Sequence, residues 1–238
     1  MLSGTETIIW YSNAKFKVMD LHESHYDEVI TLIKHHFFAE EPLCKSSKLL
    51  DDSASVASYL NFIRTWMKDT CSLVAVSAKS GRVIGVAITR IDSSIEKSDT
   101  FNRVQVYEGE PLKAIMQLKN SLISQADAYQ TFGQNAYLRI YVLSIHPSFK
   151  IKGVDSALLK ACGLVASNMQ IPVVAGIFTS NEHQKLAYHC EYLLISEIFY
   201  RNWIIDEKVV FDNTGDENVS AAFMFLSVLD TKMKENKN

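Results

Sequence analysis

The pattern best suited to binding a ligand lies in residues 141–159. The sequence there reads Tyr-Val-Leu-Ser-Ile-His-Pro-Ser-Phe-Lys-Ile-Lys-Gly-Val-Asp-Ser-Ala-Leu-Leu, which is an apolar strand, a short loop with lysines and glycine, and then a helical pattern. The first turn of a helix has backbone N–H groups without partners, and these bind pyrophosphate and other anions. Lys150 and Lys152 would add positive charge to such a site. An ordinary strand-to-helix connection with solvated lysines is an equally good interpretation of these residues taken alone.

A second candidate is the carboxylate that follows an aromatic pair in residues 37–43, Phe-Phe-Ala-Glu-Glu-Pro-Leu. A glutamate in an apolar environment has a raised pKa and can act as a general base near neutral pH. By itself, such a segment is more often a solvated helix end. Glu41 therefore becomes a candidate base only when other evidence supports it.

The remaining polar residues give weaker signals. His35 and His36 are adjacent, so they cannot both face one site, and His146 fits a loop as well as a catalytic role. No group of His, Cys, Asp or Glu has the spacing of metal ligands, so we expect no metal. Ser144 and Ser180 lack the strand-turn setting of a hydrolase nucleophile.

The composition indicates one domain that does not bind nucleic acid. The chain has 238 residues, of which 47% are hydrophobic, and a formal net charge of -3. This length supports one sizeable core, and the charge gives no surface for a polyanion. The four cysteines have no C-x-x-C spacing, and no segment resembles a signal peptide or a membrane span. We therefore expect a soluble cytoplasmic protein with one domain over residues 1–238, a core at about 14–230 and a flexible tail at 231–238.

The elements that must position these residues follow from hydrophobic periodicity. Strands are expected at residues 16–19, 72–78, 83–91, 137–145, 173–178, 194–200 and 221–229. Helices are expected at 22–38, 53–68, 111–132, 154–166 and 181–189, and the polar stretch 92–109 is expected to be a surface loop beside a cleft. This order predicts an α/β fold with a central mixed sheet of about seven strands and helices on both faces.

Three segments resemble a known family in their order and spacing. The first match is Phe37, Phe38, Glu41, Pro42 and Leu43, on the pattern Phe-Phe-x-x-Glu-Pro-Leu. The second is Ser144, Ile145, Phe149, Gly153 and Val154, and the third is Ile171-Pro172-Val173 with Phe178-Thr179-Ser180. Together they resemble the GCN5-related N-acetyltransferase superfamily over most of the chain, and within it the invertebrate arylalkylamine N-acetyltransferases.

The resemblance implies an activity and a set of site residues. It implies direct transfer of an acetyl group from acetyl-coenzyme A to the primary amine of a small arylalkylamine, with Glu41 as the general base. It also implies that a bulge separates the central strand from its neighbour and leaves strand N–H groups free near Leu143 or Ile145. The implied cofactor-binding residues are Leu143, Ser144, Ile145, Lys150, Ile151, Lys152, Gly153, Val154, Asp155 and Ser180. The implied substrate-binding residues are Phe38, Glu41, Pro42, Thr179 and His183. The expected partner is a small amine substrate, and neither nucleic acid nor a membrane is expected as a partner. The expected oligomeric state is a monomer or a weak homodimer.

The chain departs from the family pattern at several positions. Ile151 stands where the arylalkylamine branch commonly has glycine, and Asp155 stands where a small residue lets the backbone approach the phosphates. Glu191 replaces a turn glycine, and Tyr188 is one residue away from the position of a tyrosine general acid, a rotation of about 100° on a helix. Two alternatives follow: an acetyltransferase fold that binds without turnover, or an enzyme for polyamines, amino acids or protein lysines. A cleft lined by carboxylates would favour polyamines.

Overall fold

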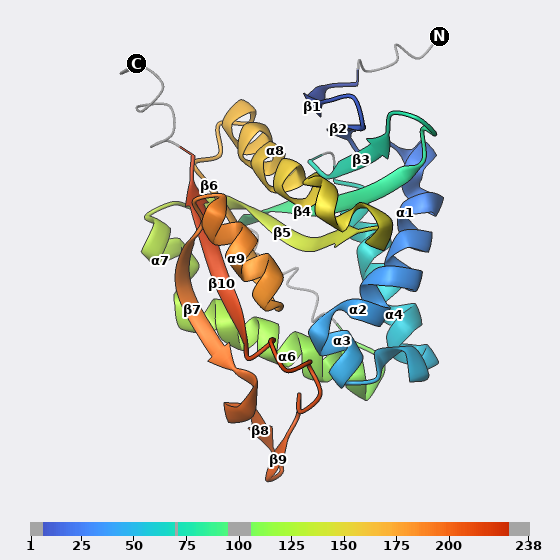
Figure 1. Ribbon diagram of the computed structural model, residues 1–238. Coiled ribbons are helices and arrows are strands. Elements are labelled where there is room, and N and C mark those ends of the chain that lie inside the picture. Colours follow the sequence, from blue (N-terminus) through green and yellow to red (C-terminus); the bar gives the residue numbers. More distant parts are fainter. Residues whose placement is uncertain (1–6, 70, 95–105, 229–238) are drawn as a thin grey trace.

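An eight-stranded mixed sheet forms the centre of the part of the chain that the structure describes, residues 7–69, 71–94 and 106–228 of a computed structural model (Figure 1). The strand order is β1-β2-β3-β4-β5-β6-β10-β7, in which β5 and β6 run parallel and the other neighbours run antiparallel. The strands are β1 (Ile9–Ser12), β2 (Phe16–Asp20), β3 (Leu73–Ser77), β4 (Val83–Ser93), β5 (Ala136–Ile145), β6 (Val173–Phe178), β7 (Leu193–Phe199) and β10 (Ser220–Ser227). A separate hairpin joins β8 (Ile204–Ile205) to β9 (Lys208–Val209).

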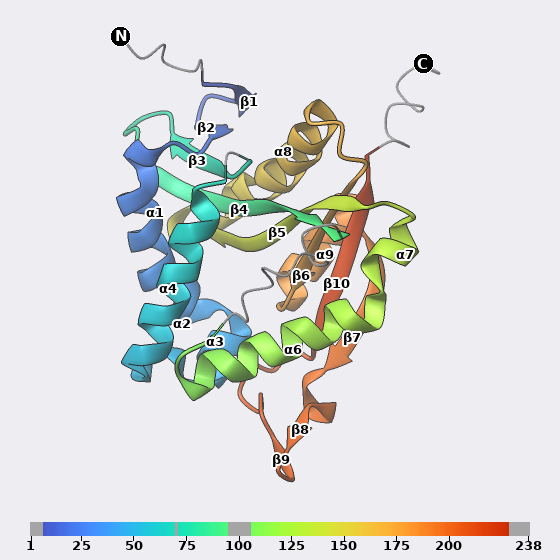
Figure 2. The ribbon, with the colours of Figure 1, turned by 180° about the vertical axis from the view of Figure 1, so that it is seen from behind.

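Helices cover both faces of this sheet, as the two opposite views show (Figures 1 and 2). On one face lie α8 (Val154–Asn168) and α9 (Asn181–His189), and on the other lie α1 (Tyr26–Leu32), α4 (Ser53–Met67) and α6 (Glu110–Ala126). The shorter helices are α2 (Phe38–Glu40), α3 (Pro42–Ser46) and α7 (Ala128–Phe132), and 3₁₀ turns cover Glu23–His25, Leu49–Asp51, Pro147–Lys152 and Tyr200–Asn202. Among the described residues, no helix is long and apolar enough to span a membrane.

Each face of the sheet has its own apolar core. On the α8 face, Val154, Leu158, Cys162 and Val165 recur at helical spacing and pack against the strands. On the other face, α4 and α6 pack against each other through their buried side chains, which include Tyr59 of α4. Fully burying one leucine or isoleucine side chain contributes about 1.5–3 kcal/mol to stability, so both layers hold the sheet firmly.

The first helical segment is longer and less regular than its periodicity predicts. After α1, a π-helical turn covers Ile33–Phe37, in which the N–H of Phe38 donates to the carbonyl of Ile33, five residues earlier. The helix then ends at Glu41, whose ψ of 126° is extended, as expected for a residue before proline. Pro42 starts α3 at a position where its missing N–H costs nothing. The sequence predicted the end of the first helix at this proline but not the start of another.

The α/β class, the mixed sheet and the helices on both faces are confirmed, with some differences in detail. The sheet has eight strands among the described residues instead of about seven, because β1 pairs with β2 ahead of the expected core. The helix expected at 111–132 is divided at Asp127, which has a left-handed φ of 37°. Of the expected loop 92–109, residues 95–105 lie outside the described residues, as does the expected tail 231–238.

Candidate active site

The strands β5 and β6 separate at the centre of the sheet. They pair at Leu138–Ile140 with Val174–Gly176, but β5 continues along β4 to Ile145 and β6 continues along β10 to Phe178. In the pairing of β5 with β4, Ile140 lies opposite Thr89 and Val142 lies opposite Ile88, so Tyr141 is an extra residue. An extra residue in one strand of a pair is a β-bulge, which bends the strand and increases its twist. The predicted bulge and separation of the strands are thus confirmed.

The separation leaves backbone donors of β5 without a strand partner. The N–H of His146 donates to the carbonyl of Ile84 on β4 at 2.8 Å. Because donors alternate in direction along an antiparallel strand, the N–H groups of Leu143 and Ile145 point away from β4, toward the gap beside β6. Two parallel donors in such a gap can bind amide or carbonyl oxygens of a ligand.

A cavity of about 380 Å³ lies at this gap. Its walls come from β5, β6, the junction of α2 and α3, the first turns of α8 and α9, one residue of α6 and a loop before β10. The sequence-predicted residues that line it are Glu41, Pro42, Leu143, Ser144, Ile145, Lys150, Asp155, Thr179, Ser180 and His183. The three segments that carried the family resemblance therefore meet at one site.

The other predicted residues lie near the cavity in different settings. Phe38 is 1% exposed and stacks on Tyr59 with ring centroids 5.2 Å apart, while its neighbour Phe37 lines the cavity. Val154 is the first residue of α8 and is fully buried, and Gly153 precedes that helix with a left-handed φ of 73°. Ile151 and Lys152 belong to the turn Pro147–Lys152, and their side chains lie outside the described part of the structure.

Glu41 combines burial with a free carboxylate oxygen. It is the N-cap of α3, and its Oε2 accepts the N–H of Cys44 at 2.7 Å. The residue is 8% exposed, and its Oε1 is buried without a hydrogen-bond partner among the described residues. Its neighbour Glu40 instead has a side chain that is 40% exposed and forms an ion pair with Lys150. Glu41 thus lines the cavity and keeps one carboxylate oxygen without a hydrogen bond among the described residues.

The first turn of α8 holds a carboxylate as well as backbone donors. Oδ1 of Asp155 accepts the N–H of Ser156 at 2.8 Å, so this acid occupies a donor that an anion at the helix end would use. Lys150, the cation predicted to face the pyrophosphate, is paired with Glu40. Asp155 and the pairing of Lys150 with Glu40 therefore both oppose an anion at this helix end.

The start of α9 is linked to a loop that the sequence did not indicate as part of the site. Ser180 caps the helix by accepting the N–H of His183 at 3.2 Å. Burial lowers the pKa of His183, although Glu182 partly offsets this effect, so the imidazole is neutral at neutral pH. The N–H of Asn181 donates to Oδ1 of Asn218 at 3.0 Å, which brings residues 215–218 to the cavity wall. No local pattern in the sequence signals a contact of this range.

Tyr188, considered as a general acid, lies away from the site. Its side chain is 70% exposed on α9, whereas Ala187 before it is fully buried. The side chain of Tyr188 is therefore turned away from the site, as its offset of one residue along the helix predicted.

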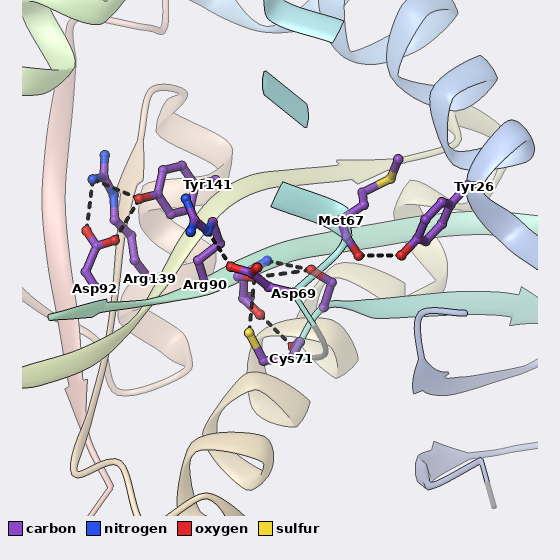
Figure 3. Close-up of polar contacts among 10 residues, drawn as sticks. Tyr26, Met67, Asp69, Cys71, Arg90, Asp92, Arg139 and Tyr141 are labelled. Carbon is purple, nitrogen blue, oxygen red and sulfur yellow. Dashed lines mark hydrogen bonds and ion pairs between the residues drawn. The ribbon is translucent and has the colours of Figure 1, made fainter. Parts of the chain in front are cut away.

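The bulge residue Tyr141 lines the cavity and is held by a polar cluster (Figure 3). Its hydroxyl donates to Oδ1 of Asp92 at 2.7 Å, and Nη1 of Arg139 donates to Oδ2 of Asp92 at 3.1 Å. The Arg139 guanidinium carbon lies 4.3 Å from the centroid of the Tyr141 ring. Burial and the charge of Asp92 raise the pKa of the Tyr141 hydroxyl, so it remains a donor at neutral pH. The cluster therefore holds the bulge residue of β5, next to the point where β5 separates from β6.

The cavity carries more acidic than basic side chains. Its carboxyl groups belong to Glu40, Glu41, Asp155, Glu182, Asp216 and Glu217, and its lysines are Lys119 and Lys150. His36 also lines it, with its ring 4.7 Å from that of His146, and burial together with this neighbour lowers the pKa of His36. Of these, Lys119, Glu182, Asp216 and Glu217 were not singled out from the sequence. Such a surface attracts cationic ligands.

The comparisons with known proteins identify the fold through the structure but not through the sequence. No protein-family model matches the sequence, and no curated protein sequence matches it. The structure, in contrast, is similar to many solved structures. The chain has the fold of the GCN5-related N-acetyltransferases, as the three segments predicted.

Within this class, similar structures include two arylalkylamine N-acetyltransferases of the yellow fever mosquito Aedes aegypti. Number 7 has a TM-score of 0.84 and 20% sequence identity, over 96% of this chain and 98% of that one. Number 2 has a TM-score of 0.79 and 22% identity, over 90% of this chain and 99% of that one. A polyamine N-acetyltransferase of Drosophila melanogaster, which forms N-acetylagmatine, has a TM-score of 0.76 and 17% identity, over 89% and 99%.

Proposed function

We propose that the protein transfers the acetyl group of acetyl-coenzyme A to the primary amine of a small arylalkylamine, with Glu41 as the general base. The observation that carries this proposal is the unpartnered Oε1 of the buried Glu41, in a cavity at the separation of β5 and β6. A buried carboxylate with one free oxygen suits proton removal from an amine. The fold shared with arylalkylamine N-acetyltransferases supports the same activity.

The residues of the cavity fit the two substrates in most respects. Acetyl-coenzyme A would supply an acetyl thioester activated for attack by an amine. The N–H groups of Leu143 and Ile145 would bind oxygens of the pantetheine arm or of the thioester. The α8 end would hold the pyrophosphate, with Asp155 as an opposing charge. Glu41 would take the amine proton, directly or through a water molecule, so that the nitrogen lone pair becomes available.

A thiol-release assay with a panel of amines tests this proposal. Acetyl-coenzyme A is incubated with the protein and with tyramine, tryptamine, phenethylamine, agmatine or spermidine, and free thiol is measured. Amine-dependent release that is fastest with the aromatic amines supports the proposal. No release with any amine, from a folded protein, would refute it.

The acidic cavity favours polyamines as a second class of acceptor. Six carboxyl groups line the cavity against two lysines, and the second ammonium of a polyamine would bind such a surface. The fold similarity to the Drosophila polyamine enzyme is compatible with this alternative. Faster release with agmatine or spermidine than with tyramine would select it.

Asp155, Ile151 and Glu191 motivate a third alternative, an acetyltransferase fold that binds a ligand or partner without turnover. Thermal unfolding with and without acetyl-coenzyme A distinguishes this case. A ligand present at 100-fold its dissociation constant stabilises the folded state by about 2.7 kcal/mol. No rise in melting temperature with acetyl-coenzyme A would favour the alternative without turnover.

A further inference from the structure

Lys119 is a buried cation at the wall of the cavity. It lies on α6, on the same face as Ile115 and Leu122, which are fully buried. Lys119 itself is 9% exposed and lines the cavity. Lys113 on the same helix behaves as an ordinary surface lysine, because its side chain is 47% exposed and pairs with Glu110. The burial of Lys119 therefore requires an explanation that the helix alone does not give.

The ammonium group has fewer partners than donors. Nζ of Lys119 donates to the hydroxyl of Tyr59 at 3.1 Å. Tyr59 is fully buried and is held between the rings of Phe38 and Trp66, so this hydroxyl is fixed in place. Within the described residues, Lys119 forms no ion pair with a carboxylate and no other hydrogen bond. An ammonium has three N–H donors, so two remain for a ligand or for water.

Lys119 keeps its charge although it is buried. Burial by itself lowers the pKa of the ammonium, but the attraction of Tyr59 and of Glu41 outweighs this effect and raises it. Glu41 is thus a carboxylate that attracts this ammonium, and both residues line the cavity. Its Oε1 is buried and has no hydrogen-bond partner among the described residues. The residues that line the cavity therefore include a carboxylate with one oxygen that lacks a hydrogen bond and an ammonium with one hydrogen bond, and the two form no ion pair with each other.

We infer that Lys119 binds a carboxylate of the acceptor, so that the preferred acceptor is an amino acid, whose ammonium faces Glu41. This inference rests on the proposed acetyl transfer and replaces the arylalkylamine as preferred acceptor with the amino acid that bears the same side chain. A zwitterion supplies both missing partners, because its ammonium donates to Oε1 of Glu41 and its carboxylate accepts from Nζ of Lys119. The rings of Phe37 and Tyr141 also line the cavity and provide contacts for an aromatic side chain.

A simple amine satisfies the site less well. It would leave the donors of Lys119 to water, and a polyamine would place a second positive charge near Lys119. The carboxylates Asp216 and Glu217, on the loop before β10, would still attract a cationic side chain such as that of arginine. The inference is therefore tested by comparing each amino acid, as an acceptor, with the amine that lacks its carboxylate.

Matched pairs of acceptors provide the test. Tyrosine with tyramine, phenylalanine with phenethylamine, tryptophan with tryptamine, and arginine with agmatine each differ only in the carboxylate. We expect the wild type to show the higher kcat/KM for at least one amino acid over its amine. Lys119→Met should lower kcat/KM for that amino acid by about 10- to 100-fold, the range for losing a charged hydrogen bond. The loss should be smaller for the matched amine, because a change of charge near Glu41 acts on both acceptors, whereas only the amino acid loses a contact to its carboxylate.

Two controls separate recognition from folding. Lys119→Arg keeps the charge and should retain most of the preference, and Lys113→Met removes a lysine from the exposed side of α6 and should change neither acceptor. The matched amine serves as the folding control within Lys119→Met itself. A wild type that prefers the amine in every pair, or an equal loss for both members in Lys119→Met, would overturn the inference.

The proposed function and this inference fail in different ways. If acetyl-coenzyme A releases no thiol with either member of any pair, the proposed function fails. Calorimetric titration of the amino acid and its amine into the protein then still tests Lys119. Binding of the amino acid that is lost in Lys119→Met supports the inference, and equal binding to both proteins contradicts it.

Discussion

Replacing Glu41 with glutamine is expected to separate turnover from cofactor binding. The substitution keeps the size of the side chain, and its carbonyl oxygen can still accept the N–H of Cys44, which now lies 2.7 Å from Oε2. The N-cap of α3 is therefore retained. The amide nitrogen then stands in place of Oε1 and cannot accept a proton from the amine. Losing a general base slows turnover by about 10²–10⁴-fold.

Glu41→Gln is also expected to lower the free energy of unfolding, but not enough to prevent folding. The buried amide N–H₂ would lack an acceptor, and Lys119 would lose the charge that balances its own. An unsatisfied buried polar group costs about 1–3 kcal/mol. In a chain of this size, each kcal/mol lowers the melting temperature by about 2–4 °C. Glu41→Gln should therefore fold, with a melting temperature lowered by a few degrees.

Steady-state thiol release gives kcat, and calorimetry gives the dissociation constant of acetyl-coenzyme A. We expect kcat to fall by the full factor while the dissociation constant stays close to that of the wild type. Glu40→Gln is the matched control, because its exposed ion pair with Lys150 contributes little. The reasoning is refuted if Glu40→Gln is the inactive variant, or if Glu41→Gln weakens cofactor binding as much as it slows turnover.

Three further substitutions test other parts of the site. Asp155→Ala should free the N–H of Ser156 and tighten coenzyme A binding, with a gain that shrinks as salt rises, and calorimetry showing no gain at low salt would contradict this expectation. Gly153→Val should weaken coenzyme A binding because valine disfavours the φ of 73°. Asparagine tolerates that conformation, so Gly153→Asn should bind coenzyme A more nearly as the wild type does. Equal dissociation constants for the wild type and both variants would show that the loop is not part of the site. Tyr141→Phe should lower the free energy of unfolding by about 1–2 kcal/mol by removing a donor to Asp92, and chemical denaturation that detects no change would mean that the cluster does not stabilise the bulge.

Elements with strong local signals were predicted well from the sequence. Strand β6 and helix α9 have the predicted bounds, because an apolar run followed by the N-cap Ser180 marks both. The bulge in β5 and the position of Glu41 followed from the family resemblance. In each case a few neighbouring residues carry the information.

The parts of the site that were missed depend on contacts distant in the sequence. Lys119 lies in an amphipathic helix where lysine normally reaches solvent, and its burial follows from packing against Tyr59, sixty residues away. The loop at residues 215–218 reaches the cavity through the bond between Asn218 and Asn181. Periodicity describes one element at a time, so neither contact could be predicted from it.

The π-helical turn at Ile33–Phe37 allows the first helical segment to hold an additional residue without turning the site away from the cavity. Such a turn holds one residue more than the α-helix does, so it corresponds to a single inserted residue that the helix has absorbed. Removing one residue there, such as the exposed His35, would restore regular α-helical bonding and leave the residues on either side in their present orientations. Glu40 and Glu41 would then still face the same way. Homologous chains that lack one residue in this turn would therefore present the same Glu-Pro-Leu side chains to the cavity, although their sequences align with a gap of one residue.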